Sequence, residues 1–212
     1  MGASPALDAA LTLDHDAQLM LRVKDGDNDS FRLLLEKHRA PVVRFVYRMV
    51  RDQAVSEELG QEVFLRIYRS RATYEPAAKF TTWLFRIASH LALNWLRDGR
   101  NERARNVSME VREEGAPVRE FPDRGPSAED AMVREVRLEE IRGAIAQLPE
   151  KQRAAVLMHK YEEMEYSQIA GALGCSESAV KSLLFRAYET LRARLAHLTS
   201  LNQTGFEKRG AA

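Results

Sequence analysis

Polar side chains recur at helical spacing within the stretch from Phe80 to Arg97. The polar set is Arg86, His90, Asn94 and Arg97, and the apolar set on another side is Phe80, Leu84, Ile87, Leu91 and Trp95. Steps of three and four residues place each set on its own face of a helix. Such a helix can bury one face and offer hydrogen bonds to a polar partner from the other. The alternative is an ordinary core helix with a solvated back.

A second group of polar residues follows a turn signal further along the chain. Gly174 can adopt the left-handed conformation of a sharp reversal, and Ser176 can cap the helix that follows. Ala170 is small enough for two helices to cross closely, and Val180 can fill the space between them. The pattern indicates a helix-turn-helix. Its second helix would present three polar residues near its start: Lys181, Ser182 and Arg186. Side chains at that place reach base edges and phosphates of DNA, although a plain helical hairpin is the alternative.

The rest of the chain offers no sign of catalysis or of a bound cofactor. The five histidines show no metal-ligand spacing, and neither a phosphate-binding glycine loop nor a nucleophile elbow is present. The single cysteine, Cys175, cannot form an internal disulfide or a multi-thiolate metal site. Its place in the tight turn favours a small apolar role over redox sensing. We therefore expect no enzyme activity, no catalytic residue, no cofactor and no metal.

Composition is that of a globular protein with one large domain or two small ones. The chain has 212 residues, of which 45% are hydrophobic and 30% charged, and its formal net charge is +1. A balanced total can still hide basic faces. No run approaches the roughly 18 apolar residues of a membrane span, and the first residues lack the pattern of a secretory signal. We expect a cytoplasmic protein without membrane insertion.

Four helices are expected in the first half of the chain, after a mobile lead-in over residues 1–14. The expected helices span 17–24, 31–49, 56–69 and 80–97, within a first domain over 15–105. Pro41 lacks an amide donor, so we expect a kink or break near Ala40. Thr81 or Thr82 is expected to cap the fourth helix, and Gly99 to end it.

The second half begins after a segment rich in glycine, proline and mixed charges. Residues 106–127 show almost no apolar periodicity and are expected to form a flexible linker. A second domain over 128–198 should contain helices over 128–147 and from Pro149 to about Tyr161, then the helix-turn-helix. Residues 199–212 are expected to be disordered. Nothing alternates with period two for the length of a strand, so the predicted fold is all-α.

Four segments in fixed order carry a family resemblance. They read EELGQEVFLRIYR, KFTTWLFRIASHLALNWLR, LPEKQRAAVLM and YSQIAGALGCSESAVKSLLFRAYETLR. In this order and spacing they resemble the extracytoplasmic-function (group IV) sigma factors of bacterial RNA polymerase, over residues 16–195. The resemblance implies two helical domains joined by a flexible segment. The first would recognise and help melt the minus-ten promoter element, and the second would read the minus-thirty-five element.

The resemblance also implies roles for individual residues. Minus-ten contacts would come from Arg71, Tyr74, Lys79, Trp83, Phe85, Arg86, His90, Asn94, Arg97 and Arg100. Minus-thirty-five contacts would come from Ser178, Lys181, Ser182, Phe185 and Arg186, and core polymerase would bind Glu58, Leu59, Gln61, Glu62 and Phe64. Aromatic rings such as Trp83 and Phe85 can support unstacked bases. The loop over residues 70–79 would hold a flipped base and tune sequence preference.

The implied partners are promoter DNA, the largest subunits of core RNA polymerase and an anti-sigma factor. The chain would act as a monomeric sigma subunit within the holoenzyme, with its linker threading near the polymerase active centre. Two alternatives remain from the residues alone. One is a stand-alone helix-turn-helix regulator whose first helices sense a ligand or dimerise. The other is a helical adaptor or anti-sigma-like protein that binds no DNA.

Three positions depart from the family pattern. His90 stands where asparagine is common, which could make one minus-ten contact sensitive to pH. Leu183 stands where arginine or lysine is frequent, which removes a phosphate or base contact. Glu165 stands where a small capping residue is common. These departures leave the class intact but weaken any inference about the promoter sequence.

Overall fold

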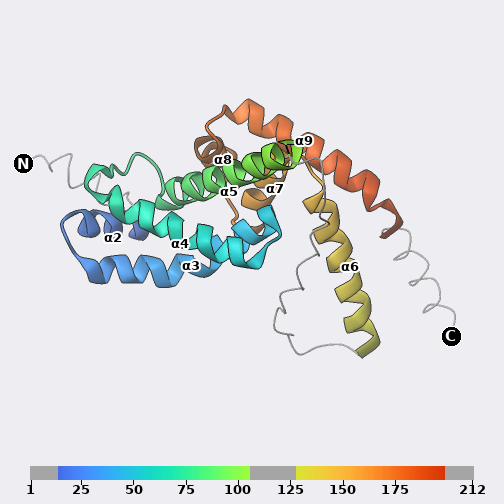
Figure 1. Ribbon diagram of the computed structural model, residues 1–212, viewed down its shortest axis with the longest axis horizontal. Coiled ribbons are helices and arrows are strands. Elements are labelled where there is room, and N and C mark those ends of the chain that lie inside the picture. The colour runs from blue at the N-terminus through green and yellow to red at the C-terminus, as the bar shows by residue number, and fades with distance from the viewer. Residues whose placement is uncertain (1–13, 106–127, 199–212) are drawn as a thin grey trace, which may run out of the picture.

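The computed structural model describes residues 14–105 and 128–198. Every regular element in these two ranges is helical, which confirms the all-α expectation (Figure 1). The expected linker over 106–127 and tail over 199–212 lie outside the described residues, as does all of the lead-in except Asp14. No described helix is both long enough and apolar enough to cross a membrane.

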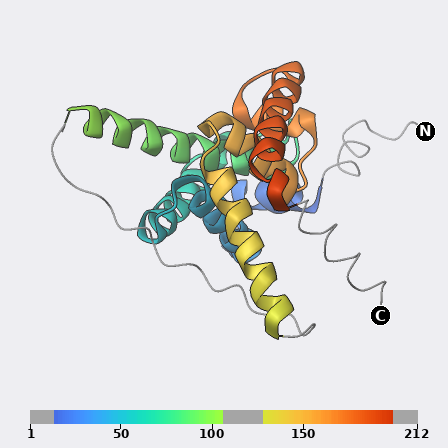
Figure 2. The same ribbon diagram turned by 90° about the vertical axis from the view of Figure 1, so that its right-hand side faces the viewer.

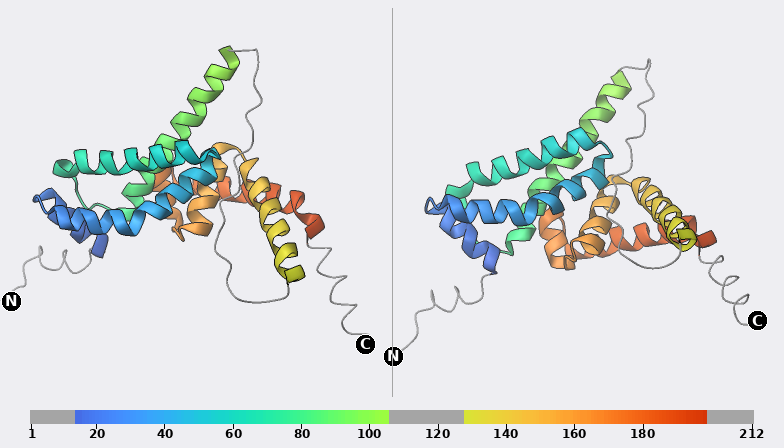
Figure 3. Two further views of the ribbon diagram at one scale, coloured as in Figure 1. Left: turned by 60° about the horizontal axis from the view of Figure 1, so that its bottom comes forward. Right: turned by 90° about the horizontal axis from the view of Figure 1, so that it is seen from below.

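The first half consists of four α-helices and one 3-10 turn. They are α2 (His15–Lys24), α3 (Asn28–Val50), α4 (Gln53–Arg69), η1 (Arg71–Thr73) and α5 (Phe80–Arg105). Helices α3, α4 and α5 pack on one another, and α2 crosses α3. The apolar stripes that the sequence predicts supply the contacts, since their largest side chains are buried. The C-terminal turns of α5 extend away from this packed body (Figures 2 and 3).

We expected a kink or a break near Ala40, and the structure excludes the break, since helix α3 continues through Pro41. Proline inside a helix costs about 3 kcal/mol through the lost hydrogen bond and the ring clash. Val42, Phe45 and Val46 follow on the inner face and are fully buried. Packing of these side chains outweighs the local penalty of the proline.

The start of α4, the end of α5 and the capping partner of α5 differ from the expected ones. Helix α4 begins three residues before Ser56, and Asp52 caps it by accepting a hydrogen bond from Val55 N at 3.0 Å. The first amide of α5, Phe80 N, donates to Asp14 Oδ2 at 3.1 Å, so neither Thr81 nor Thr82 is the observed capping partner. Helix α5 also continues past Gly99, which therefore does not end it. One glycine inside a helix costs only about 1 kcal/mol.

The second half contains α6 (Ala128–Ala146), α7 (Glu150–Tyr161), α8 (Tyr166–Leu173) and α9 (Glu177–Arg194). Helices α8 and α9 form the predicted helix-turn-helix. Gly174 has a φ of +62°, and Ser176 Oγ accepts from Ala179 N at 3.2 Å. Val180 is fully buried between the helices. The signals at Gly174, Ser176 and Val180 are therefore confirmed.

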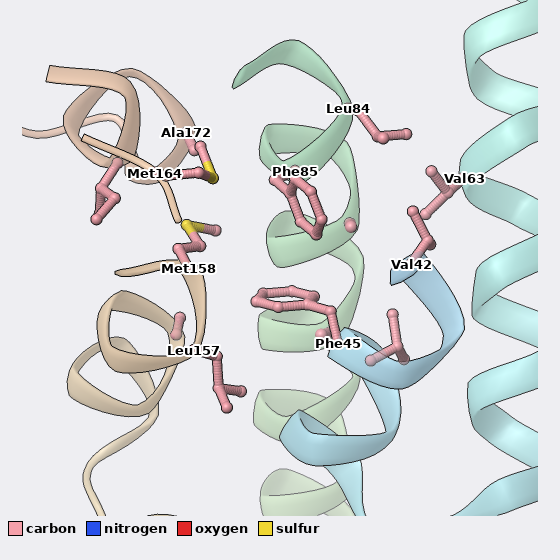
Figure 4. Packing of buried hydrophobic residues seen from close by; sticks show 14 of the residues in the cluster. Val42, Phe45, Val63, Leu84, Phe85, Leu157, Met158, Met164 and Ala172 are labelled. Carbon is pink, nitrogen blue, oxygen red and sulfur yellow. The ribbon is translucent and has the colours of Figure 1, made fainter. Parts of the chain in front are cut away.

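The two halves share one hydrophobic core. Phe45 of α3 and Phe85 of α5 face Met158 of α7, and Met164 and Ala172 approach the same space from the α8 side (Figure 4). All five side chains are buried. The sequence predicted two joined helical units, and the structure adds that α7 and α8 pack directly on α3 and α5.

Polar contacts reinforce this packing at its edge. Arg153 of α7 donates to the carbonyl oxygen of Met49 at the end of α3 and also to the carbonyl oxygens of Ala146 and Leu148. The guanidinium of Arg48 lies 4.0 Å from the centre of the Tyr161 ring. Both interactions join the C-terminal end of α3 to the second half of the chain.

Candidate nucleic-acid and protein-binding surfaces

The polar residues of α5 lie on one face, as their spacing predicts. Arg86, His90 and Arg97 are exposed, and Asn94 is half-buried. Asn94 Nδ2 lies 3.4 Å from His90 Nε2, one helical turn away. Arg100 lies beyond the side chains that the structure describes. The described stripe offers cationic, imidazole and amide groups to an anionic or hydrogen-bonding partner.

The two aromatic residues proposed to support bases have different surroundings. Phe85 is only 2% exposed, and its ring packs edge-on against Phe45 with centroids 5.3 Å apart. It is a core residue here and cannot stack on a base in this arrangement. Trp83 is half-buried beside the ring of Tyr74, with 4.9 Å between centroids. Trp83 thus keeps a partly exposed ring near the polar stripe.

The loop before α5 is anchored at its middle and exposed toward its end. Tyr74 is 4% exposed, and burial, with the nearby charges of Asp14 and Asp16, raises the pKa of its hydroxyl to about 12. Arg71 donates to Tyr68 O at 2.8 Å and lies over the Tyr68 ring. Lys79 is exposed. Of the three loop residues predicted to touch DNA, only Lys79 is fully available to a partner here.

A cleft of about 360 Å³ separates the α5 stripe from the helix-turn-helix. Its lining comes from three helices: Arg66, Trp83, Arg86, Ile87, Ser89, His90, Leu93, Ala172, Leu173 and Gly174. Ser89 Oγ lies 3.5 Å from the carbonyl oxygen of Ala172. The C-terminal end of α8 therefore borders the polar stripe, and α8 limits the room for any ligand of Arg86 and His90.

The start of α9 is the most accessible of the predicted surfaces. Its five proposed contact residues, Ser178, Lys181, Ser182, Phe185 and Arg186, are all exposed. Arg186 Nε donates to Ser182 O at 3.2 Å, while Phe185 is 67% exposed, unusual for so large an apolar side chain. Leu183 is half-buried against the core, so its side chain is not part of this exposed face.

The α4 surface only partly matches its predicted members. Glu58 and Gln61 are exposed, whereas Leu59 and Glu62 are half-buried. Phe64 is 4% exposed and belongs to the core, so it cannot contact a partner without rearrangement. Sequence reasoning missed Leu65, which is 48% exposed. The sequence does contain a sign of this exposed residue, because Leu65 is apolar and lies outside the stripe formed by Leu59, Val63 and Ile67.

Within the described ranges, no group of three or more His, Cys, Asp and Glu side chains is placed to hold an ion. Cys175 is a half-buried free thiol in the helix-turn-helix turn.

Comparisons with known proteins cover both halves. Residues 34–102 match the model of Sigma-70 region 2, and residues 138–191 match that of Sigma-70, region 4. The chain is 33% identical over 191 residues to the RNA polymerase sigma-H factor of Pseudomonas aeruginosa, covering 89% of this chain and 97% of that protein. It is 31% identical over 180 residues to the ECF RNA polymerase sigma-E factor of Escherichia coli, covering 83% of this chain and 92% of that protein.

A solved structure shares the fold. It is the sigma factor RpoE of Bartonella quintana in complex with the anti-sigma factor NepR, with a TM-score of 0.63 and 19% sequence identity. The superposition covers 78% of this chain and 96% of that chain.

Proposed function

The chain belongs to the extracytoplasmic-function sigma factors of bacterial RNA polymerase, and on that premise we propose which of its surfaces meet promoter DNA and polymerase. The proposed division assigns the minus-ten element to residues 15–105 and the minus-thirty-five element to residues 128–198. The observation that carries it is the pair of separate polar faces, on α5 and at the start of α9.

The minus-thirty-five element is assigned to the exposed start of α9. Lys181 and Arg186 supply positive charge, and Ser178 and Ser182 supply short hydroxyl groups. The first turns of a recognition helix lie deepest in the major groove, where such groups reach base edges and phosphates. Phe185 adds an exposed apolar surface suited to a thymine methyl group.

The minus-ten element is assigned to the polar stripe of α5 and the loop before it. Trp83 offers a ring for stacking, and Arg86, His90 and Asn94 can bond to the edges or phosphates of unpaired bases. Because Ala172 and Gly174 border the same cleft, single-stranded DNA reaches the whole stripe only after α8 moves off α5. Promoter melting on this surface therefore requires the two halves to separate. The same movement uncovers Phe85.

Polymerase is assigned to the exposed side of α4, where Glu58 and Gln61 lie near the apolar Leu65. A mixed surface of this kind suits a protein partner. An anti-sigma factor is the second protein partner, as in the complex of the related fold with NepR. The protein acts in the cytoplasm as a monomeric, non-enzymatic subunit of the holoenzyme.

The deciding experiment is transcription with purified core polymerase. The full chain should bind core polymerase and start RNA synthesis at a promoter of its own genome, and changes in either promoter element should abolish initiation. Failure to bind core polymerase would make the proposal wrong. Specific duplex binding by the free chain, with no effect on core polymerase, would instead indicate a stand-alone regulator.

A further inference from the structure

Asp14 connects the start of α2 to the start of α5. Its Oδ1 accepts from Ala17 N at 2.6 Å, which caps α2, and its Oδ2 accepts from Phe80 N at 3.1 Å. A carboxylate at two helix N-termini is favoured by both helix dipoles. The end of the loop before α5 is thereby tied to a residue 66 positions earlier in the chain.

Lys24, at the other end of α2, holds the same loop near its middle. Its Nζ donates to the carbonyl oxygen of Tyr74 at 3.0 Å. The Tyr74 side chain is buried against Trp83, and its hydroxyl has no hydrogen-bond partner among the described residues. The loop between these two ties, residues 75–79, is largely exposed. Its two ends are fixed, one by Lys24 at the end of α2 and the other by Asp14, the residue that caps the start of α2.

Helix α2 is itself held firmly in place. Asp16 is buried and accepts from Lys37 Nζ at 2.7 Å, and it lies 2.8 Å from His38 Nε2. Leu19, Met20 and Val23 place their side chains in the core. A rigid helix with a charged group at each end can therefore define the distance that the exposed loop spans.

We propose that α2 is a clamp for the loop Ser70–Lys79, and that Asp14 and Lys24 are positioning residues for minus-ten discrimination. The inference rests on the proposed role of this loop in reading the minus-ten element. A reading loop discriminates among bases only if its backbone is held in one geometry, since a loose loop adapts to the wrong base. The α2 helix precedes residues 34–102, the segment that matches the region 2 model.

The test uses Lys24→Met and Asp14→Asn in the full chain, with Arg22→Met as the matched control. Arg22 lies on the same turn as Lys24 and makes no hydrogen bond to the loop in the described part of the chain. Trypsin cleavage after the exposed Lys79 is measured first, on the free protein. Losing a hydrogen bond to a charged group should raise that rate about tenfold, because local opening then becomes easier.

Discrimination is measured second, with core polymerase on a promoter and on its single-base minus-ten variants. The ratio of initiation on the intact element to that on the variants should fall about tenfold for Lys24→Met and Asp14→Asn. Lys24→Arg should keep most of the ratio, and discrimination at the minus-thirty-five element should stay unchanged in every variant.

Each outcome decides a separate point. Unchanged cleavage after Lys79 means that α2 does not clamp the loop. Faster cleavage with unchanged minus-ten ratios means that the clamp has no positioning role, and the proposal is then wrong. A wild-type chain that never initiates with core polymerase overturns the proposed function instead. If Asp14→Asn fails to fold by circular dichroism, Lys24→Met still decides, since Lys24 is exposed.

Discussion

Gly171 of α8 and Thr82 of α5 meet across the boundary between the two halves, where a Cβ atom at position 171 would lie 3.1 Å from Thr82 Cγ2. A side chain at position 171 therefore has little room on the inner side. Ala172, the next residue of α8, belongs to the same core as Phe85 and lines the cleft beside the polar stripe of α5.

Gly171→Leu should push α8 away from α5. Overpacking at such a contact costs about 1 to 3 kcal/mol, which favours the separated arrangement by roughly 5-fold to 100-fold. Small-angle X-ray scattering of the free chain should report a larger radius of gyration. Gly143→Leu is the control, because a Cβ atom there meets no atom within 4 Å. Equal radii for both variants would contradict the expectation.

Lys181→Ala and Arg186→Ala should each weaken holoenzyme binding to a promoter by about 1 to 3 kcal/mol if either side chain contacts a base. The loss should disappear on a template whose minus-thirty-five element is scrambled. Lys151→Ala, an exposed cation on α7, controls for the change in charge. Normal promoter occupancy in both variants would remove the basis for placing α9 in the major groove.

Arg86→Ala and Asn94→Ala should impair strand opening more than initial duplex binding. A lost contact to an unpaired base or its phosphate is worth about 1 to 3 kcal/mol, so the open fraction should fall about tenfold. Permanganate footprinting of unpaired thymines measures that fraction, and gel shift measures duplex binding. Arg32→Ala, an exposed residue of α3 paired only weakly with Asp29, serves as control. Unchanged permanganate reactivity would count against the stripe as the melting surface.

Asp16→Asn should lower the free energy of unfolding at pH 7 by about 2 kcal/mol, as expected for hydrogen bonds to charged groups. Burial alone would raise the pKa of the Asp16 carboxyl, but hydrogen bonds from Lys37 and His38 and their positive charges hold it below its usual 3.8. The stabilisation is therefore complete above pH 3.8 and is lost as the pH falls through the lower pKa of the folded state.

Urea unfolding at pH 7 and at successively lower pH checks this dependence. The difference in the free energy of unfolding between wild type and Asp16→Asn should narrow on acidification below pH 3.8. Asp29→Asn is the control, because Asp29 belongs to an exposed ion pair with Arg32. Its free energy of unfolding should be almost equal to that of wild type at any pH. A gap that stays constant in acid would mean that the carboxylate charge of Asp16 does not contribute.

Local signals in the sequence were sufficient for the helix-turn-helix. Gly174, Ser176 and Val180 act within a few residues of one another, so their effect can be predicted without knowing the rest of the fold. The amphipathic faces of α5 were predictable for the same reason, because helical spacing alone assigns each side chain to a face.

The features that could not be predicted from the sequence depend on contacts between residues far apart in the chain. The partner of the first α5 amide is Asp14, 66 residues away, so no local rule could have chosen it over Thr81 or Thr82. Phe85 lies next to the polar stripe in sequence, yet it is buried because α7 and α8 cover that side of α5. The helix also continues through Pro41 because the residues after it are buried against other helices, and the local helix propensity of the sequence contains no information about those contacts.

The shared core has a consequence for chain exchange between relatives. Phe45 and Phe85 must fit Met158, Met164 and Ala172, so the shape of one half restricts which second half it can accept (Figure 4). A chimaera that joins residues 14–105 to the second half of another family member would bring unmatched side chains to this contact. We expect such hybrids to keep the packed arrangement of the free chain only when the facing residues of α7 and α8 are transferred to fit the host. In this protein, the two halves are therefore matched parts of one core and not freely interchangeable modules.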